Sequence, residues 1–295
     1  MHPHGLDPEI ARVTPKYPSL AAPRSWLFVP ADSEKKIAKA LASDADAIIF
    51  DLEDSVAADR KAAARTLLKD LPPRAGGPRW WVRINPVGSE HLKADLKMLA
   101  SADMFGIVLP KAEGAGDVTH IAHRTGNVPI HAIVTETAAS LFCLSSYRDA
   151  KAPLVAMSWG AEDLSAALGA SSKYGADGEL AFTYKLARSL TLAGAIAAKV
   201  QPVDGVFADF KDDHGLELEA RAAASEGFTG KLAIHPNQVA IINAAFTPSL
   251  AEVAHAEAII AAFAAKPEAG VLSVGGRMVD RPHLLQAQGV LARAR

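Results

Sequence analysis

The sequence lacks most of the compositional features that would by themselves identify a protein class. Among its 295 residues there is one cysteine, Cys143, which excludes an intramolecular disulfide framework and suits a reducing cytoplasm. We interpret Cys143 as a small buried residue rather than as a nucleophile. The formal net charge is -2, so electrostatic attraction to nucleic acid or to a membrane surface has no basis here. We therefore predict a cytoplasmic protein with neither nucleic acid nor membrane as a partner.

Long apolar runs are also missing. No stretch of eighteen or more apolar residues occurs, so the sequence predicts no transmembrane helix. Residues 1–23 are polar and proline-rich and lack the layout of a signal peptide, which predicts a loose arm. The chain is nevertheless 49% hydrophobic and 22% charged, which is typical of a globular protein with a large core.

Short apolar runs recur along the chain. They are continuous rather than alternating, as expected for parallel strands that are covered on both faces. The eight candidate strands are Ser25–Val29, Ala47–Leu52, Trp80–Ile84, Gly106–Pro110, Ile130–Val134, Leu154–Trp159, Gly205–Ala208 and Leu232–Ile234.

Alanine-rich segments of helical composition separate these runs. They include Glu34–Ala42, Lys61–Leu71, His91–Ala100, Asp117–Arg124, Thr183–Lys199 and Glu217–Ser225. Eight strand-then-helix units predict an α/β fold, a (β/α)₈ TIM barrel, over residues 24–247. A doubly wound sheet is the main alternative, but no G-x-G-x-x-G follows the first strand.

Residues 248–295 exceed what a barrel needs. Pro248–Ala265 and Pro282–Ala294 read as helices, and Val271–Asp280 reads as a hairpin that turns at Gly275 and Gly276. We predict a helix–hairpin–helix extension that acts as a lid over the active site or as a subunit contact.

Ionisable residues follow the candidate strands where each one ends. In a barrel enzyme these ends meet at the face that carries the chemistry. The residues are Asp51, Glu53 and Asp54 after the second strand, Arg83 and Asn85 after the third, Lys111, Glu136, Glu162 and Asp163 after the next three, Asp209 and Asp212 after the seventh, and His235 after the eighth.

Glu136 and Asp163 are the predicted metal ligands. Two carboxylates at neighbouring strand ends can hold one Mg²⁺ and leave its other positions to water and substrate oxygens, and Mn²⁺ is an alternative ion. No His/Cys cluster has zinc spacing.

Several of these side chains have two readings. Arg83 suits a substrate carboxylate because its planar fork bonds carboxylates bidentately, and an ion pair with the Asp51–Asp54 cluster is equally compatible with the spacing. Lys61 and Arg65 are four residues apart and so share a helix face. Their simplest role is to make that face soluble. His235 is either an acid–base group or a residue that orients its loop.

The motifs at these positions, taken in order, resemble the citrate lyase β-subunit-like branch of the HpcH/HpaI aldolase superfamily. The resemblance runs from about Arg24 to the C-terminus. Its motifs are Arg24–Pro30, Asp51–Val56 with Lys61 and Arg65, Val82–Asn85, Leu109–Lys111, Gly160–Leu164, Gly230–Pro236 with Gln238, and Gly276–Asp280.

The resemblance implies a barrel, usually a trimer, that makes or breaks a carbon–carbon bond beside a thioester carbonyl. Glu136 and Asp163 would hold Mg²⁺ and Arg83 would bind the oxo acid. Asp280 would reach into a neighbouring subunit's site as an acid–base group. On this basis we predict Asp280, Arg83 and Glu53 as catalytic residues, and substrate contacts from Arg83, Arg24, Lys111, Asp54, Ile234, His235 and Pro236.

The predicted activity is cleavage or formation of a 3-hydroxy-acyl-CoA thioester of the malyl-, citramalyl- or citryl-CoA type. An oxo acid and acetyl-CoA are the other reactants. The predicted enzyme is a homotrimer or a higher oligomer. Three alternatives stay open: a citrate lyase β subunit acting on a carrier-protein thioester, a class II aldolase acting on free 2-oxo acids, and an enzyme that also hydrolyses the thioester.

Overall fold

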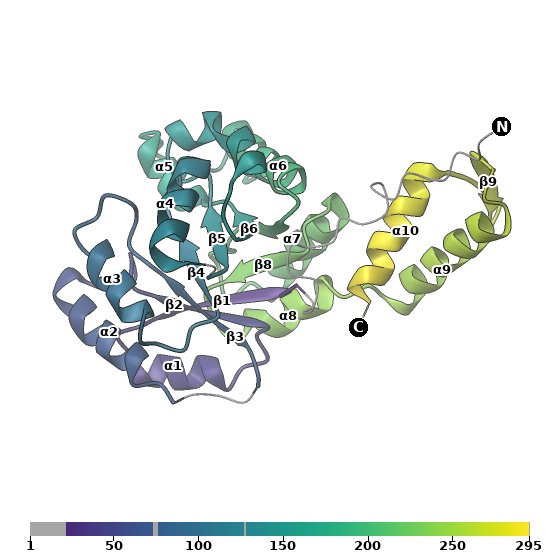
Figure 1. Ribbon diagram of the computed structural model, residues 1–295. Helices are drawn as coiled ribbons and strands as arrows, with labels where there is room; N and C mark the ends of the chain where they lie inside the picture. Colours follow the sequence, from purple (N-terminus) through teal and green to yellow (C-terminus); the bar gives the residue numbers. More distant parts are fainter. Residues whose placement is uncertain (1–21, 73–75, 127, 295) are drawn as a thin grey trace. The chain divides into compact units, whose positions relative to one another are not determined.

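The computed structural model describes residues 22–72, 76–126 and 128–294. Its strands form a closed barrel in which each strand pairs in parallel with its neighbours in the chain and β8 pairs with β1 (Figure 1). The barrel strands are β1 (Ser25–Pro30), β2 (Ala47–Asp51), β3 (Arg79–Arg83), β4 (Gly106–Leu109), β5 (Ile130–Ile133), β6 (Leu154–Ser158), β7 (Gln201–Asp204) and β8 (Gly230–Ala233). The predicted (β/α)₈ barrel is therefore confirmed.

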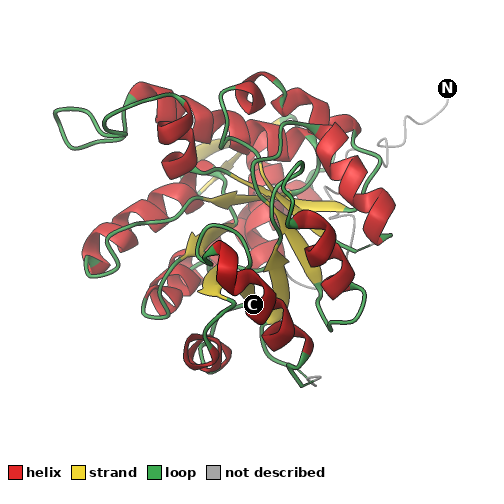
Figure 2. Cartoon of the chain, turned by 90° about the vertical axis from the view of Figure 1, so that its left-hand side faces the viewer, coloured by secondary structure: helices red, strands yellow, loops and turns green. Residues whose placement is uncertain are grey.

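Helices surround the strands, as Figure 2 shows in red around yellow. The barrel helices are α1 (Glu34–Leu41), α2 (Lys61–Lys69), α3 (Leu92–Leu99), α4 (Ala115–Thr125), α5 (Ala161–Ala167), α6 (Phe182–Ala197), α7 (Asp213–Glu226) and α8 (Gln238–Ala245). Short 3-10 turns lie at Ala58–Arg60, Ala139–Phe142 and Leu144–Asp149.

The strands are continuous apolar runs because their side chains are buried both inside the barrel and beneath the helices. One core cluster takes residues from all eight strands, including Trp26, Trp81 and Val203. The rings of Trp26 and Trp81 lie 4.9 Å apart, centroid to centroid. This packed core fixes the strand ends against one another and so positions the side chains that follow them.

The seventh strand was predicted four residues too late. Strand β7 is Gln201–Asp204, whereas Gly205–Ala208 lies in the loop that follows it. Its sequence does not read as a strand because it contains Pro202 and ends on a carboxylate. The structure accommodates both, since the carbonyl of Pro202 accepts from Thr229 and Asp204 pairs with the buried ammonium of Lys231.

The chain divides into two compact units, residues 1–242 and 243–295. The second contains helix α9 (Leu250–Ala265), a hairpin of β9 (Val271–Val274) and β10 (Arg277–Asp280), and helix α10 (Arg281–Arg293). Gly275 and Gly276 form the hairpin turn with φ of 57° and 77°, values that favour glycine. The unit has its own apolar cluster, centred on Ile259, Phe263 and Val279.

Among the described residues, the segment Gln238–Ala265 has the length and hydropathy of a membrane span. It contains no uninterrupted apolar run of eighteen residues, so it was not predicted from the sequence. The structure divides this segment into α8 and α9, with Pro248 between them and Ser249 as the N-cap of α9. Helix α8 buries Val239 and Ile242, and α9 contributes Ile259 and Phe263 to the cluster of the second unit.

Candidate active site

Asp51 and Arg83 form the base of the site. They are the last residues of β2 and β3, and the register of the barrel sets them side by side. Arg83 donates to both carboxylate oxygens of Asp51, from Nε at 2.7 Å and from Nη2 at 2.6 Å. Burial would raise the pKa of Asp51, but the charge of Arg83 and its hydrogen bonds hold that pKa below its ordinary value. Asp51 is thus a buried carboxylate that fixes the guanidinium.

The third guanidinium nitrogen of Arg83 faces Glu53. Its Nη1 lies 3.1 Å from Glu53 Oε2, and the guanidinium carbon is 4.7 Å from the centroid of the Phe28 ring. Burial raises the pKa of Glu53, although Arg83 and Lys111 both oppose the shift. Of the two readings of Arg83, the ion pair with the acidic motif is present in the structure, and the contact with a substrate carboxylate stays a prediction.

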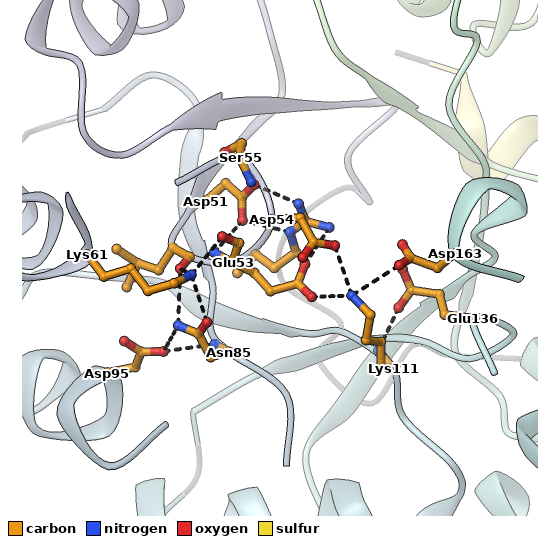
Figure 3. Close-up of polar contacts among 12 residues, drawn as sticks. Asp51, Glu53, Asp54, Ser55, Lys61, Asn85, Asp95, Lys111, Glu136 and Asp163 are labelled. Atoms are coloured by element: carbon orange, nitrogen blue, oxygen red, sulfur yellow. Dashed lines mark hydrogen bonds and ion pairs between the residues drawn. The ribbon is translucent and has the colours of Figure 1, made fainter. Parts of the chain in front are cut away.

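Lys111 stands among the acidic side chains (Figure 3). Its Nζ donates to Glu53 Oε1 and, at 2.9 Å, to Asp54 Oδ2, and it lies 3.2 Å from Asp163 Oδ1. Burial opposes the charge of Lys111, but these hydrogen bonds raise its pKa above the ordinary value. The residue has a φ of 51°, an unfavourable conformation for a side chain other than glycine, and such conformations concentrate at functional sites.

The same strained residue also contacts Glu136 through its backbone. The N–H of Lys111 donates to Glu136 Oε2 at 2.5 Å. Burial raises the pKa of Glu136 to about 8; the Lys111 N–H opposes the shift and the charge of Asp163 adds to it. Asp163 lies in the first turn of α5, and Figure 3 shows it on the same side of Lys111 as Glu136. The structure therefore brings the two predicted metal ligands together.

This pair fits Mg²⁺ better than a metal that needs a full protein cage. In the described part of the chain, no group of three or more His, Cys, Asp and Glu side chains could hold a metal. Mg²⁺ commonly binds through one or two carboxylates and keeps waters or substrate oxygens in its remaining positions. Glu136 and Asp163 would hold the ion, and the ammonium of Lys111 already shows that a cation is accommodated beside Asp163.

Lys61 and Arg65 were predicted as two residues that solubilise one helix face, but in the structure both form specific contacts. Lys61 Nζ donates to the carbonyls of Leu52 and Glu53 at 2.6 and 2.7 Å and to Asn85 Oδ1 at 2.9 Å. Arg65 Nε donates to Asp95 Oδ1 at 2.7 Å, and Asp95 Oδ2 accepts from Asn85. Together these contacts fix the loop that carries Glu53. Sequence reasoning missed Asp95, because a carboxylate within a helix such as α3 carries no motif.

A second buried network, also missed, supports the strand that leads to Asp163. Asp204 Oδ1 accepts from Trp159 Nε1 and from Arg188 Nε, both at 2.8 Å, and its Oδ2 accepts from Lys231 Nζ. Burial would raise the pKa of Asp204, but these two cations lower it to about 2. Trp159 directly precedes Gly160 at the start of α5, so the network fixes the segment beside the two predicted metal ligands. This network was missed because the seventh strand was predicted to lie after Asp204.

Arg24 lies away from this site. It precedes β1, whereas the acidic motif follows β2, and six strand residues span about 20 Å. Arg24 Nε and Nη2 donate to Asp46 Oδ2 and Oδ1 at 2.9 and 3.0 Å, at the opposite end of the strands. The structure thus separates Arg24 from the acidic motif, and its predicted contact with the coenzyme A or carrier arm stays a prediction.

Ile234, His235 and Pro236 directly follow β8, at the same end of the barrel as the acidic motif. The backbone N–H groups of Ile234 and His235 point to Gln238 Oε1, at 2.9 and 3.3 Å. The His235 ring stacks on Phe210 and accepts at Nδ1 from the N–H of Asn237. These contacts favour the loop-orienting reading of His235. Contact with a substrate stays a prediction for all three.

Asp280 ends β10 in the second compact unit, where Asp280 Oδ1 and His283 Nδ1 are 2.5 Å apart. Its predicted role in a neighbouring subunit stays a prediction. The residues 1–21 that were predicted as a loose arm lie outside the described residues.

Comparison with known proteins identifies the family. The family model described as HpcH/HpaI aldolase/citrate lyase matches residues 24–236, and a model described as a carbon–carbon bond lyase of the TIM-barrel fold matches residues 184–295. The chain belongs to the HpcH/HpaI aldolase/citrate lyase family. It is a carbon–carbon lyase of that family, similar to citrate lyase β subunits, as the sequence motifs predicted.

Three relatives in this family show the range of activities around the chain. A citrate lyase subunit beta-like protein of Mycobacterium tuberculosis is 41% identical over 93% of this chain and 96% of its own length. A (3S)-malyl-CoA thioesterase of Cereibacter sphaeroides is 40% identical over 92% and 94%. The mitochondrial citramalyl-CoA lyase of Rattus norvegicus is 33% identical over 92% and 86%.

Solved structures of the family contain the predicted small molecules. The M. tuberculosis protein CitE in complex with magnesium, acetoacetate and coenzyme A has a TM-score of 0.80 and 40% identity, and the match covers 93% of this chain and 98% of that chain. The citrate lyase beta subunit of M. tuberculosis with oxaloacetate and magnesium has a TM-score of 0.71 and 41% identity, and the match covers 77% and 98%.

Proposed function

We propose that this protein is a Mg²⁺-dependent lyase that cleaves or forms a 3-hydroxy-acyl-CoA thioester, with an oxo acid and acetyl-CoA as the smaller reactants. The observation that carries the proposal is the pairing of Glu136 and Asp163 around Lys111, beside the Arg83 guanidinium. A divalent ion and two fixed cations, Arg83 and Lys111, at the C-terminal end of the barrel strands suit a small oxo acid. The metal and coenzyme A in the related CitE structure support the same choice of ligands.

Bound Mg²⁺, for which Mn²⁺ is the alternative, would lower the pKa of the substrate hydroxyl and polarise the oxygen of the oxo acid. Arg83 and Lys111 orient the oxo acid and balance the charge that develops on its oxygen. Both are held in place before substrate arrives, by Asp51 and by Glu53 and Asp54, so little reorganisation is needed during the reaction.

Glu53 and Asp280 are the proposed acid–base groups. In the cleavage direction Glu53 takes the proton of the substrate hydroxyl, since burial raises its pKa and makes it a better base than an exposed carboxylate. Breaking the carbon–carbon bond leaves a thioester enolate, and Asp280 protonates its carbon. In the synthetic direction Asp280 removes that proton from the acetyl group.

The oligomer belongs to the same proposal. Asp280 lies in a compact unit separate from the barrel, and the family resemblance implies that this aspartate acts in a neighbouring subunit. We propose a homotrimer in which each second unit supplies Asp280 to the next barrel.

The relative from C. sphaeroides favours a second candidate, hydrolysis of the thioester, because it is a (3S)-malyl-CoA thioesterase and is 40% identical to this chain. Product analysis separates the two: cleavage of malyl-CoA gives glyoxylate and acetyl-CoA, whereas hydrolysis gives malate and free CoA.

The decisive experiment incubates the purified protein with Mg²⁺ and malyl-, citramalyl- or citryl-CoA, and follows acetyl-CoA, free CoA and the acids. Magnesium-dependent cleavage that is lost in Asp163→Asn is expected. Asp149→Asn is the control, because Asp149 is 79% exposed and pairs only loosely with Arg148, at 3.7 Å. If folded protein cleaves none of these esters, the stand-alone activity is wrong, and carrier-bound thioesters and free 2-oxo acids become the substrates to test.

A further inference from the structure

The N-terminus of α10 contains an aspartate–histidine pair that bears on the proposed chemistry. Asp280 is the N-cap of the helix and His283 is its third residue. Asp280 Oδ1 lies 2.5 Å from His283 Nδ1, and the backbone N–H of Asp280 lies 3.2 Å from the same ring nitrogen. The two side chains are 35% and 43% exposed. The pair is therefore in close contact and open to solvent or to a ligand.

Two protonation states of the pair are compatible with the short contact between Nδ1 and Oδ1, and they differ in the contact with the N–H. When Nδ1 carries no proton, it accepts from the Asp280 N–H, and Asp280 Oδ1 must carry a proton to approach it at 2.5 Å. When Nδ1 carries the proton, it donates to an ionised Asp280 and the contact with the N–H is lost. A single proton at Oδ1 or at Nδ1 distinguishes the two states.

His283 is the main charged partner of Asp280 in the described part of the second unit. The β9 residue opposite Asp280 is Val271, and β9 has no charged side chain. Arg281 donates to the carbonyl of Pro267 and lies over the Phe263 ring. The titratable groups on α9 are Glu252, which acts on Arg293 near the other end of α10, His255 and Glu257. Arg277 stands on β10, three residues before Asp280. The hydrogen bond from His283 is the largest cause of the pKa shift of Asp280.

We propose that His283 passes protons to and from Asp280, and that the two residues act as one acid–base unit in the lyase reaction. This inference rests on the proposed role of Asp280 and extends it to a residue that acts through Asp280 without touching the substrate. The hydrogen bond from His283 lowers the pKa of Asp280, so the carboxyl holds a proton less readily beside the ring than it would alone. The proton that the pair shares therefore rests on His283 until Asp280 passes it on.

In the cleavage direction the imidazolium of His283 transfers its Nδ1 proton to Asp280 Oδ1. Asp280 then gives that proton to the enolate carbon, the enolate electron pair forms the new carbon–hydrogen bond, and the thioester carbonyl is restored. Asp280 is left ionised, and the neutral ring regains a proton from solvent, which reaches it because the side chain is exposed. In the synthetic direction every transfer runs in reverse.

The alternative is a purely structural capping box, since the side chains and N–H groups of Asp280 and His283 also cap α10. His283→Gln separates the two roles, because glutamine at this position is a usual capping-box residue and does not titrate. We expect His283→Gln to keep the unfolding midpoint of the wild type while kcat falls about ten- to a hundredfold, below the roughly 10²–10⁴ typical of a direct acid–base group. KM should change little.

The pH–rate profile provides a second readout. The dependence of kcat on pH should differ between the wild type and His283→Gln, because glutamine cannot carry the proton that His283 passes to Asp280. Wild-type kcat and an unchanged profile in His283→Gln would overturn the relay. If Asp280→Asn is inactive at the same time, the proposed role of Asp280 survives; if Asp280→Asn keeps full activity, that role fails and the relay fails with it.

A measurement without substrate tests the contact itself. Nitrogen-15 spectra of the histidine side chains, assigned by the signal that His283→Gln removes, should show a proton on Nδ1 that depends on Asp280. A ring that never carries a proton on Nδ1, or that is unaffected by Asp280→Asn, would contradict the proposal whatever the protein's activity.

Discussion

Gly160 lies against the side chain of Glu136. A Cβ at position 160 would be 2.7 Å from Glu136 Cγ, closer than real Cβ contacts come, and 3.0 Å from its Oε1, which is tighter than most such contacts. Glu136 is buried and its other oxygen is fixed by the Lys111 N–H, so its carboxylate has little room to move. Glycine at position 160 therefore leaves the space that Glu136, one of the two predicted metal ligands, occupies.

Gly160→Ala should displace the Glu136 carboxylate and weaken Mg²⁺ binding about 10- to 100-fold, as when other groups that orient metal ligands are changed. Isothermal titration with Mg²⁺ or Mn²⁺ measures the effect. The control is Gly116→Ala on α4, where a Cβ meets nothing within 4 Å, and which should leave metal affinity unchanged. Equal affinities in the two variants would show that the pocket tolerates the methyl group.

Lys111→Met should destabilise the metal-free protein, because it leaves buried Glu53 without the ammonium that pairs with it. The expected loss is about 1–3 kcal/mol in the free energy of unfolding, measured by urea denaturation. Lys199→Met is the matched control, since Lys199 is also a lysine with positive φ, at 57°, and forms none of these ion pairs. A similar loss in both variants would show that the ion pairs of Lys111 are not its cause.

Mg²⁺ binding should depend on pH through Glu136. Its pKa is raised by burial from 4.5 to about 8, so its contribution to the stability of the metal-free fold is full below 4.5 and is lost as the pH rises through about 8. Metal binding needs the ionised carboxylate, so Mg²⁺ should displace a proton near neutral pH and bind more tightly as the pH rises. Calorimetry in two buffers with different ionisation enthalpies counts the proton. Affinity that does not change with pH up to about 8 would contradict the shift.

Arg83→Lys should lower kcat about 10²- to 10³-fold, because lysine cannot hold Asp51 and face Glu53 with three fixed nitrogens at once. Arg24→Lys removes a comparable guanidinium–aspartate pair at the opposite end of the strands. It should cost stability without lowering kcat, and steady-state kinetics with thermal unfolding measures both. A rise in the KM for the CoA ester in Arg24→Lys would support the predicted contact of Arg24 with the coenzyme A arm.

Mixed oligomers test whether Asp280 serves a neighbouring barrel. Asp163→Asn and Asp280→Asn are each expected to be inactive alone. Unfolding and refolding them together, or co-expressing them, should restore part of the activity, because some sites then combine an intact barrel with an intact Asp280. Activity that stays absent in verified mixed oligomers would place Asp280 in its own protomer's site or outside the reaction.

The barrel could be predicted from sequence because its strands are apolar runs whose ends carry the ionisable residues. The exception, β7, shows the limit of that signal. Asp204 is buried with Arg188 and Lys231, and no local pattern reveals cations that approach from α6 and from the next strand. Burial of a charge is a property of the assembled fold, so the strand was placed where the sequence looks more apolar.

The candidate site shows the same division. The spacing of Glu136 and Asp163 along the chain predicted that they would meet, because strand order fixes which ends are neighbours. The sequence could not show that Lys111 links them, since this depends on a positive φ and on a side chain that crosses to Glu53 and Asp54. Nor could the sequence show that Arg24 lies away from the acidic site, because its motif matches the family as well as the others do. Arg24 precedes its strand, whereas the acidic residues follow theirs.

The small apolar cluster around Ile259, Phe263 and Val279 gives the carboxyl-terminal unit a core built from its own residues. Glu136 and Asp163, the predicted metal ligands, and Asp280, the proposed proton donor, thus lie in different compact units of the chain. On the proposed mechanism, we expect an exchange of residues 243–295 between relatives to change the group that transfers the proton and to keep Glu136 and Asp163. The two parts of the proposed reaction, metal binding and proton transfer, could then be altered one at a time.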